Sequence, residues 1–138
     1  MATLVFRAPN GERIENPATT LIQSVVLDPS RDYWRQGSGD ATIDFSDGNH
    51  RKRLLVLPND LLFFYLKYIE GTETWLSLQD ADRLGEVIEC SDEWYASVGL
   101  FLPRERAWLA IKDFCDTGRR CNDIQWIRPV DLPEGGNW

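Results

Sequence analysis

The residues best placed to bind or react are acidic, and they lie in one short segment. Eight acids and one base, Arg83, lie between Glu70 and Trp94, which gives this segment a formal charge of -7. The chain of 138 residues has 22 acids, 15 lysines and arginines and the same net charge of -7, so the other 14 acids and 14 bases balance. A localised negative field repels nucleic acid phosphates and attracts a basic protein. The alternative is a solvated acidic face that only aids solubility.

Two large aromatic residues follow the last acids of this segment. Aromatic anchors surrounded by charge are typical of interface hot spots, whereas an aromatic in a strand or turn usually packs into the core. We predict a partner-binding surface and no catalytic, cofactor-binding or metal site. Its candidate residues are Glu73, Asp80, Asp82, Glu86, Glu89, Asp92, Glu93, Trp94 and Tyr95.

Residue types that commonly carry out catalysis or hold metals are sparse. The single histidine, His50, lies in a predicted hairpin turn beside three basic residues, where a histidine is usually solvated. The cysteines Cys90, Cys115 and Cys121 share no CxxC spacing, which disfavours both a zinc site and a disulfide framework. Acidic neighbours should raise the pKa of Cys90 and make it a poor nucleophile. The glycine motifs of dinucleotide-binding and P-loop proteins are missing from the sequence.

Length and composition indicate one ordinary globular domain over residues 1–138. Hydrophobic residues make up 43% and charged residues 27% of a chain that is long enough to bury a core without disulfides. No apolar stretch approaches the length of a membrane span. The amino terminus lacks the pattern of a signal peptide, so we expect a cytoplasmic protein.

The first third of the chain predicts one strand, one helix and one loop. A β-prone run, Thr3–Arg7, predicts a strand at the edge of a sheet. A helix is expected to begin with Asn16 as its N-cap and Pro17 as its first residue, with apolar residues at spacings of three and four, and to end at the Asp28-Pro29 pair. The loop at residues 30–39 carries Tyr33 and Trp34, which should plug the core.

The rest of the chain predicts a β-meander followed by a helix. A helix at Arg104–Thr117, with Gly118 as its C-cap, should cover the sheet, and the tail Arg128–Trp138 should be loose. The fold class is therefore α+β, with an antiparallel sheet of about five or six strands and two main helices on one face. The predicted strands are Ala41–Phe45, Lys52–Leu57, Leu61–Ile69, Trp75–Leu78, Gly85–Cys90 and Asp123–Ile127.

Residues near the carboxyl end form one more pattern. They are Leu102 to Ala107, Ala110, Ile111, Phe114, Thr117 to Arg120, and Ile124 to Trp126. This pattern resembles the closing pattern of the first immunity-protein family of bacterial polymorphic toxin and contact-dependent inhibition systems. In that family a proline-led helix, a phenylalanine, a Thr-Gly-Arg turn and a final tryptophan strand follow a β-meander. The hairpins at residues 41–78 agree with the family only in general layout.

The resemblance implies a small inhibitor that binds a toxin, often a nuclease or a nucleic-acid deaminase, and blocks its active site. It carries over no catalytic residues, and the shared Ala107, Ile111, Phe114, Gly118 and Trp126 are explained by packing and capping. Carboxylates suit such a role, because a toxin that acts on nucleic acid needs a basic cleft for phosphates.

Two other classes of protein fit the same residues. An adaptor or regulatory module unrelated to toxins would show the same acidic segment. A small carboxylate-dependent enzyme would need at least two of the acids to converge in a concave pocket.

Overall fold

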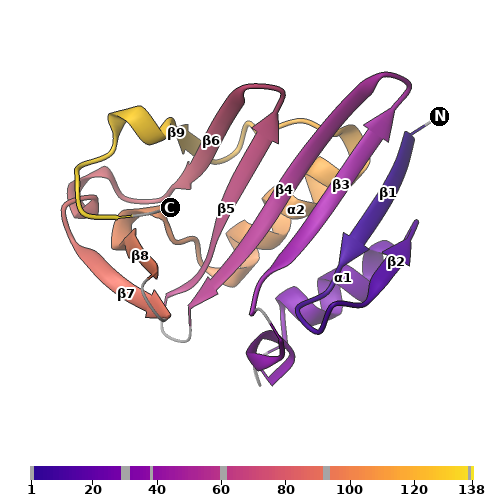
Figure 1. The fold of residues 1–138 in the computed structure, drawn as a ribbon, viewed down its shortest axis with the longest axis horizontal. Coiled ribbons are helices and arrows are strands. Elements are labelled where there is room, and N and C mark those ends of the chain that lie inside the picture. Colours follow the sequence, from indigo (N-terminus) through magenta and orange to yellow (C-terminus); the bar gives the residue numbers. More distant parts are fainter. Residues whose placement is uncertain (1, 29–31, 38, 60–61, 92–93, 137) are drawn as a thin grey trace.

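The described residues form an α+β structure with helices on one face of an antiparallel sheet. The structure is a computed structural model that describes all residues except 1, 29–31, 38, 60–61, 92–93 and 137. Seven strands make the main sheet, in the order β2-β1-β3-β4-β5-β6-β9, and β7 and β8 form a second, two-stranded sheet. Figure 1 shows α1 and α2 lying against one face of the main sheet.

The elements follow the chain with short connections. The strands are β1 (Ala2–Arg7), β2 (Arg13–Glu15), β3 (Ala41–Asp47), β4 (His50–Asn59), β5 (Phe63–Glu70), β6 (Glu73–Leu78), β7 (Val87–Ser91), β8 (Trp94–Ser97) and β9 (Gln125–Ile127). The helices are α1 (Thr19–Val26) and α2 (Arg104–Thr117), and the 3-10 turns are η1 (Asp32–Arg35), η2 (Ala81–Arg83), η3 (Val98–Leu100) and η4 (Pro129–Asp131). No helix among the described residues is both long and apolar enough to cross a bilayer.

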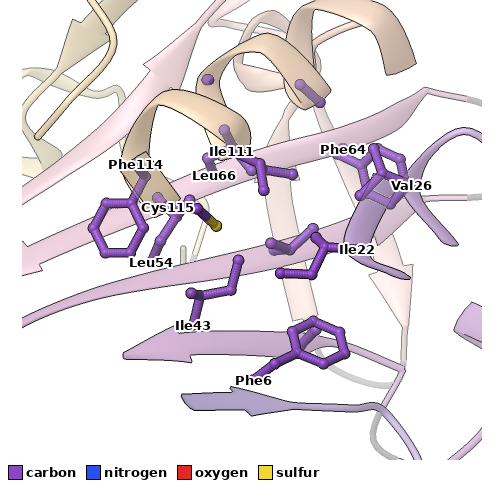
Figure 2. Close-up of a cluster of buried hydrophobic side chains, with 14 of the residues drawn as sticks. Phe6, Ile22, Val26, Ile43, Leu54, Phe64, Leu66, Ile111, Phe114 and Cys115 are labelled. Carbon is purple, nitrogen blue, oxygen red and sulfur yellow. The ribbon is translucent and has the colours of Figure 1, made fainter. Parts of the chain in front are cut away.

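The main core lies between the sheet and the two helices. Alternate strand residues face the helices, as the two-residue period of a strand requires. In Figure 2, Ile43 and Leu54 of neighbouring strands point toward Ile111 and Phe114 of α2. The helix ends where we predicted, at Gly118, which has a left-handed φ of 72° and whose N–H donates to the Phe114 carbonyl at 2.7 Å.

Two predictions about the amino-terminal region are wrong. β1 is not an edge strand, because β2 pairs with it on the outside. Asn16 is not the N-cap of α1, whose cap is Ala18. Instead the Asn16 side-chain oxygen accepts from the Leu4 N–H at 3.0 Å, and the Asn16 N–H donates to the Leu4 carbonyl at 2.7 Å. Asn16 therefore continues the hydrogen bonding along this edge of β1 to Leu4, one residue beyond the last β1–β2 pair.

The predicted aromatic plug is confirmed. Trp34 in η1 is buried, and its indole N–H donates to the Val25 carbonyl at 2.9 Å. Tyr33 packs against the same core. The predicted boundaries at Pro29 and Leu61, and loop residues 30, 31 and 38, lie outside the described residues.

The second face of the sheet, which we call the outer face, is covered over one half only. Leu57, Tyr65 and Leu76 point to this side and are buried by Ala96 of β8 and Leu100 of η3. The tail, which we expected to be loose, places Leu132 and Trp138 against the same cluster. The segment predicted to extend the main sheet as a strand near Gly85–Cys90 forms β7, which pairs with β8 and not with the main sheet.

Candidate partner-binding surface

Most of the described candidate residues lie on a small lobe attached to the outer face. We call residues 79–91 and 94–100 the acidic lobe; it contains η2, β7, β8 and η3. Ser77 of β6 joins the lobe to the sheet, because its buried hydroxyl accepts from the Leu66 N–H at 2.9 Å and donates to the Leu100 carbonyl at 2.9 Å. Figure 1 shows β7 and β8 at one end of the main sheet.

Glu89 and Tyr95 stand on the outermost surface of the acidic lobe. They are register partners in the β7–β8 pair, and the neighbouring partners are Ile88 and Ala96. Ala96 is completely buried against the main sheet. Since successive strand residues point to opposite faces, Glu89 and Tyr95 point away from the main sheet. Both are exposed, Tyr95 by 40%.

Two of the candidate acids have structural roles within the lobe. Asp80 is the N-cap of η2, and its carboxylate accepts from the Asp82 N–H at 3.0 Å. Glu86 accepts two hydrogen bonds from Arg83, at 2.8 and 3.1 Å. These bonds lower the pKa of the Glu86 carboxyl below its ordinary value and offset its charge. Among the described residues, no cation lies within ion-pairing distance of Asp82 or Glu89.

The structure separates Glu73 from the other candidates. Glu73 begins β6 in the β5–β6 hairpin, opposite Glu70. The lobe begins beyond the other end of this strand, and at about 3.3 Å per residue that end lies roughly 17 Å from Glu73. Asp92 and Glu93 lie outside the described residues.

Trp94 belongs to the core beneath the lobe. Its ring lies 5.6 Å from that of Tyr65, and it packs against the cluster on the outer face. It alternates with Tyr95 and therefore faces the sheet. We expected Trp94 to anchor a partner, but its position inside the cluster gives that role no support.

The cysteines and the histidine lie apart. The thiol pKa values of Cys90, Cys115 and Cys121 are all raised, and burial is the largest cause in each case. The expected direction for Cys90 is therefore found, but the expected cause, its acidic neighbours, is not. His50 is exposed at the start of β4. The described part of the chain brings no three His, Cys, Asp or Glu residues together as a possible metal site.

The molecule has a second charged surface, which was not predicted from the sequence. The uncovered half of the outer face carries four arginines around a shallow hollow of about 430 Å³. We call this surface the basic face; its arginines are Arg7, Arg13, Arg51 and Arg53. Asp44 lies among them and accepts from Arg53 at 2.7 Å, with Arg7 at 3.6 Å. The available signal was the pair at positions 51 and 53, since residues two apart in a strand share a face.

Comparisons with known proteins identify no relative. No protein-family model matches the chain, and no curated protein or solved structure is significantly similar to it. The resemblance to an immunity-protein family stays a prediction.

Proposed function

We propose that this protein works by binding, and that its acidic lobe docks on a basic surface of a protein partner. The observation that carries the proposal is the concentration of the excess charge of the whole chain in residues 70–94, most of which form a lobe that stands on the outer face. Charge gathered in this way steers a basic partner toward one part of the molecule.

The contact residues in this proposal are Asp82, Glu89 and Tyr95. The two carboxylates are exposed, and Tyr95, the register partner of Glu89, adds an exposed aromatic ring. Asp80 and Glu86 are occupied by the cap and the ion pair, so they support the surface and contribute less to contact. Trp94 holds β8 to the sheet from below.

We further propose that the partner is a toxin that acts on nucleic acid, which this protein neutralises in the cytoplasm by covering its active site. The carboxylates would take the place of phosphates in the basic cleft of the toxin. Support for this step comes from the carboxyl-terminal resemblance and from the charge. An adaptor unrelated to toxins would use the same lobe, and a carboxylate enzyme is disfavoured by the placement of these acids on an exposed surface.

The experiment is co-expression with the product of the adjacent upstream gene, followed by co-purification. We expect that product to be toxic alone, to be rescued by this chain and to bind it. A D82R/E89R variant should weaken binding by about tenfold or more. The matched control is E105R/D116R, which reverses two exposed acids on α2 and should leave binding within about threefold.

Three outcomes would count against the proposal. If the product of the upstream gene is harmless and does not bind, the toxin-inhibitor proposal is wrong, and an adaptor function is what is left of the proposal. If the gene product binds the D82R/E89R variant as tightly as it binds the native chain, the acidic lobe is not the docking surface. If the E105R/D116R control weakens binding as much as D82R/E89R does, the loss of affinity comes from the change in net charge and not from the lobe.

A further inference from the structure

The outer face consists of two halves that differ in charge and in height. One half is raised, because the acidic lobe is stacked on Leu57, Tyr65 and Leu76. The other half is the bare sheet of β1, β2, β3 and the first part of β4, which forms the hollow of the basic face. In Figure 1 the lobe lies near one end of the sheet, and β1 and β2 lie at the other edge. A raised acidic half and a recessed basic half are therefore neighbours on one side of the molecule.

The acids and the arginines point in the same general direction. Glu89 and Tyr95 point away from the sheet on top of the lobe, as their register shows. On β4, Leu54 is buried toward the helices, so Arg51 and Arg53 point to the outer face. On β1, Phe6 is buried in the same way, so its neighbour Arg7 also points to the outer face. A single partner surface that follows the step between the two halves would meet both charges at once.

The basic face keeps a positive balance after its internal pairs are counted. Its four arginines face only two carboxylates. Asp44 pairs with Arg53, and Glu15 pairs with Arg13 at 2.6 Å. Val5 and Ile69 line the same hollow, so aliphatic contact is available between the guanidinium groups. Arginine interleaved with apolar side chains is typical of protein interfaces.

A nucleic acid fits this surface less well than a protein. No exposed aromatic ring lines the described hollow for base stacking, which single strands use. The acidic lobe on the same side would repel an extended polyanion. The occupant should instead carry carboxylates in a compact, raised patch, and the acidic lobe of this chain is such a patch.

We propose that two copies of this chain pair face to face about a two-fold axis, with the acidic lobe of each copy seated on the basic face of the other. In a two-fold pair each contact occurs twice, so the raised half of each copy fills the recessed half of its partner. The net charge of -7 on each copy opposes association, and the pair is held by local complementarity against that repulsion. The dimer does not require the toxin, but both use the acidic lobe, so a second copy and a toxin would exclude each other from it.

The experiment is sedimentation velocity of the full chain at low ionic strength, from micromolar to near-millimolar concentration. The native chain should form a dimer. R51E and E89R should each weaken the dimer by about tenfold or more, because each change affects both contacts. The matched controls K112E and E105R make the same changes in charge at exposed positions on α2, on the helix side of the sheet, and should stay within about threefold.

Charge exchange gives the decisive readout. An equimolar mixture of R51E and E89R, and the double variant R51E/E89R, should both recover dimerisation, since every lobe again meets a face of opposite charge. E89R brings the net charge closer to zero, so weakening by this change cannot come from general repulsion. Thermal unfolding of each variant checks that it is folded. A monomer at every concentration, or a dimer that R51E and E89R leave unchanged, overturns the proposal.

Discussion

Replacement of Ser77 by alanine should loosen the junction between the main sheet and the acidic lobe. The fully buried Ser77 hydroxyl links the Leu66 N–H to the Leu100 carbonyl, at 2.9 Å on each side. Alanine leaves both backbone groups without this partner. An unsatisfied buried group costs about 1 to 3 kcal/mol, so two such groups predict a loss of about 2 to 6 kcal/mol in the free energy of unfolding.

Urea unfolding followed by tryptophan fluorescence measures this loss directly. For a chain of this length, each kcal/mol lowers the melting temperature by about 3 to 4 °C, so S77A should melt roughly 6 to 24 °C below the native chain. The control is S24A, because the exposed Ser24 hydroxyl only donates to the Leu21 carbonyl within α1. S24A should change the free energy of unfolding by less than about 0.5 kcal/mol. An S77A value as small as that of the control would refute the assigned role of this hydroxyl.

Three further changes test the packing. G118A should lose about 2 kcal/mol or more of stability, because φ is 72° and a Cβ would lie 2.5 Å from the Phe45 ring; a native unfolding midpoint would contradict the left-handed cap. W34F should lose about 1 to 2 kcal/mol, because the Val25 carbonyl loses its indole donor, and unchanged urea stability would count against that bond. Burial raises the pKa of Cys115 to about 12, from 9.0 for an ordinary thiol. Above about pH 9 the unfolded thiol loses its proton while the folded thiol keeps it, so stability falls as pH rises toward about 12. C115A should make that fall shallower in urea titrations, and equal slopes for the two chains would contradict the raised pKa.

Local signals in the sequence were enough for the second helix. Arg104–Thr117 is helical as predicted, because a proline before the helix, an apolar face and a glycine after it all act within a few residues. The central hairpins were likewise predicted, with ends displaced by one to a few residues, since alternation and turn residues mark them. The α+β class followed from these elements.

The assignment of strands to sheets depended on contacts between distant residues. β2 and β8 have three and four residues, too short for a clear period. β7 has a strand-like pattern, but which sheet it joins depends on the buried cluster around Tyr65. Asn16 was predicted as a helix cap because asparagine is favoured at the N-cap position. It instead hydrogen-bonds to Leu4, which is more than ten residues away in the sequence.

The candidate surface was predictable in composition and not in geometry. The charge count located the lobe, but neighbouring acids in sequence received different roles. Asp80 became a cap and Glu86 an ion-pair partner, while Asp82 and Glu89 stayed on the surface. The basic face was overlooked because its arginines come from β1, β2 and β4, and only the sheet brings them together.

The closing of the sheet by β9 has a consequence for biosynthesis. One edge of β6 stays unpaired during synthesis until Gln125–Ile127, which forms β9, has been made. Helix α2, which covers the helix side of the sheet, also comes late in the chain. A nascent chain that ends before residue 104 therefore carries the apolar sides of β3, β4 and β5 without the cover of α2. Nonsense fragments of this length should be prone to aggregation and degradation, so truncated products would contribute little to the cellular pool of this protein.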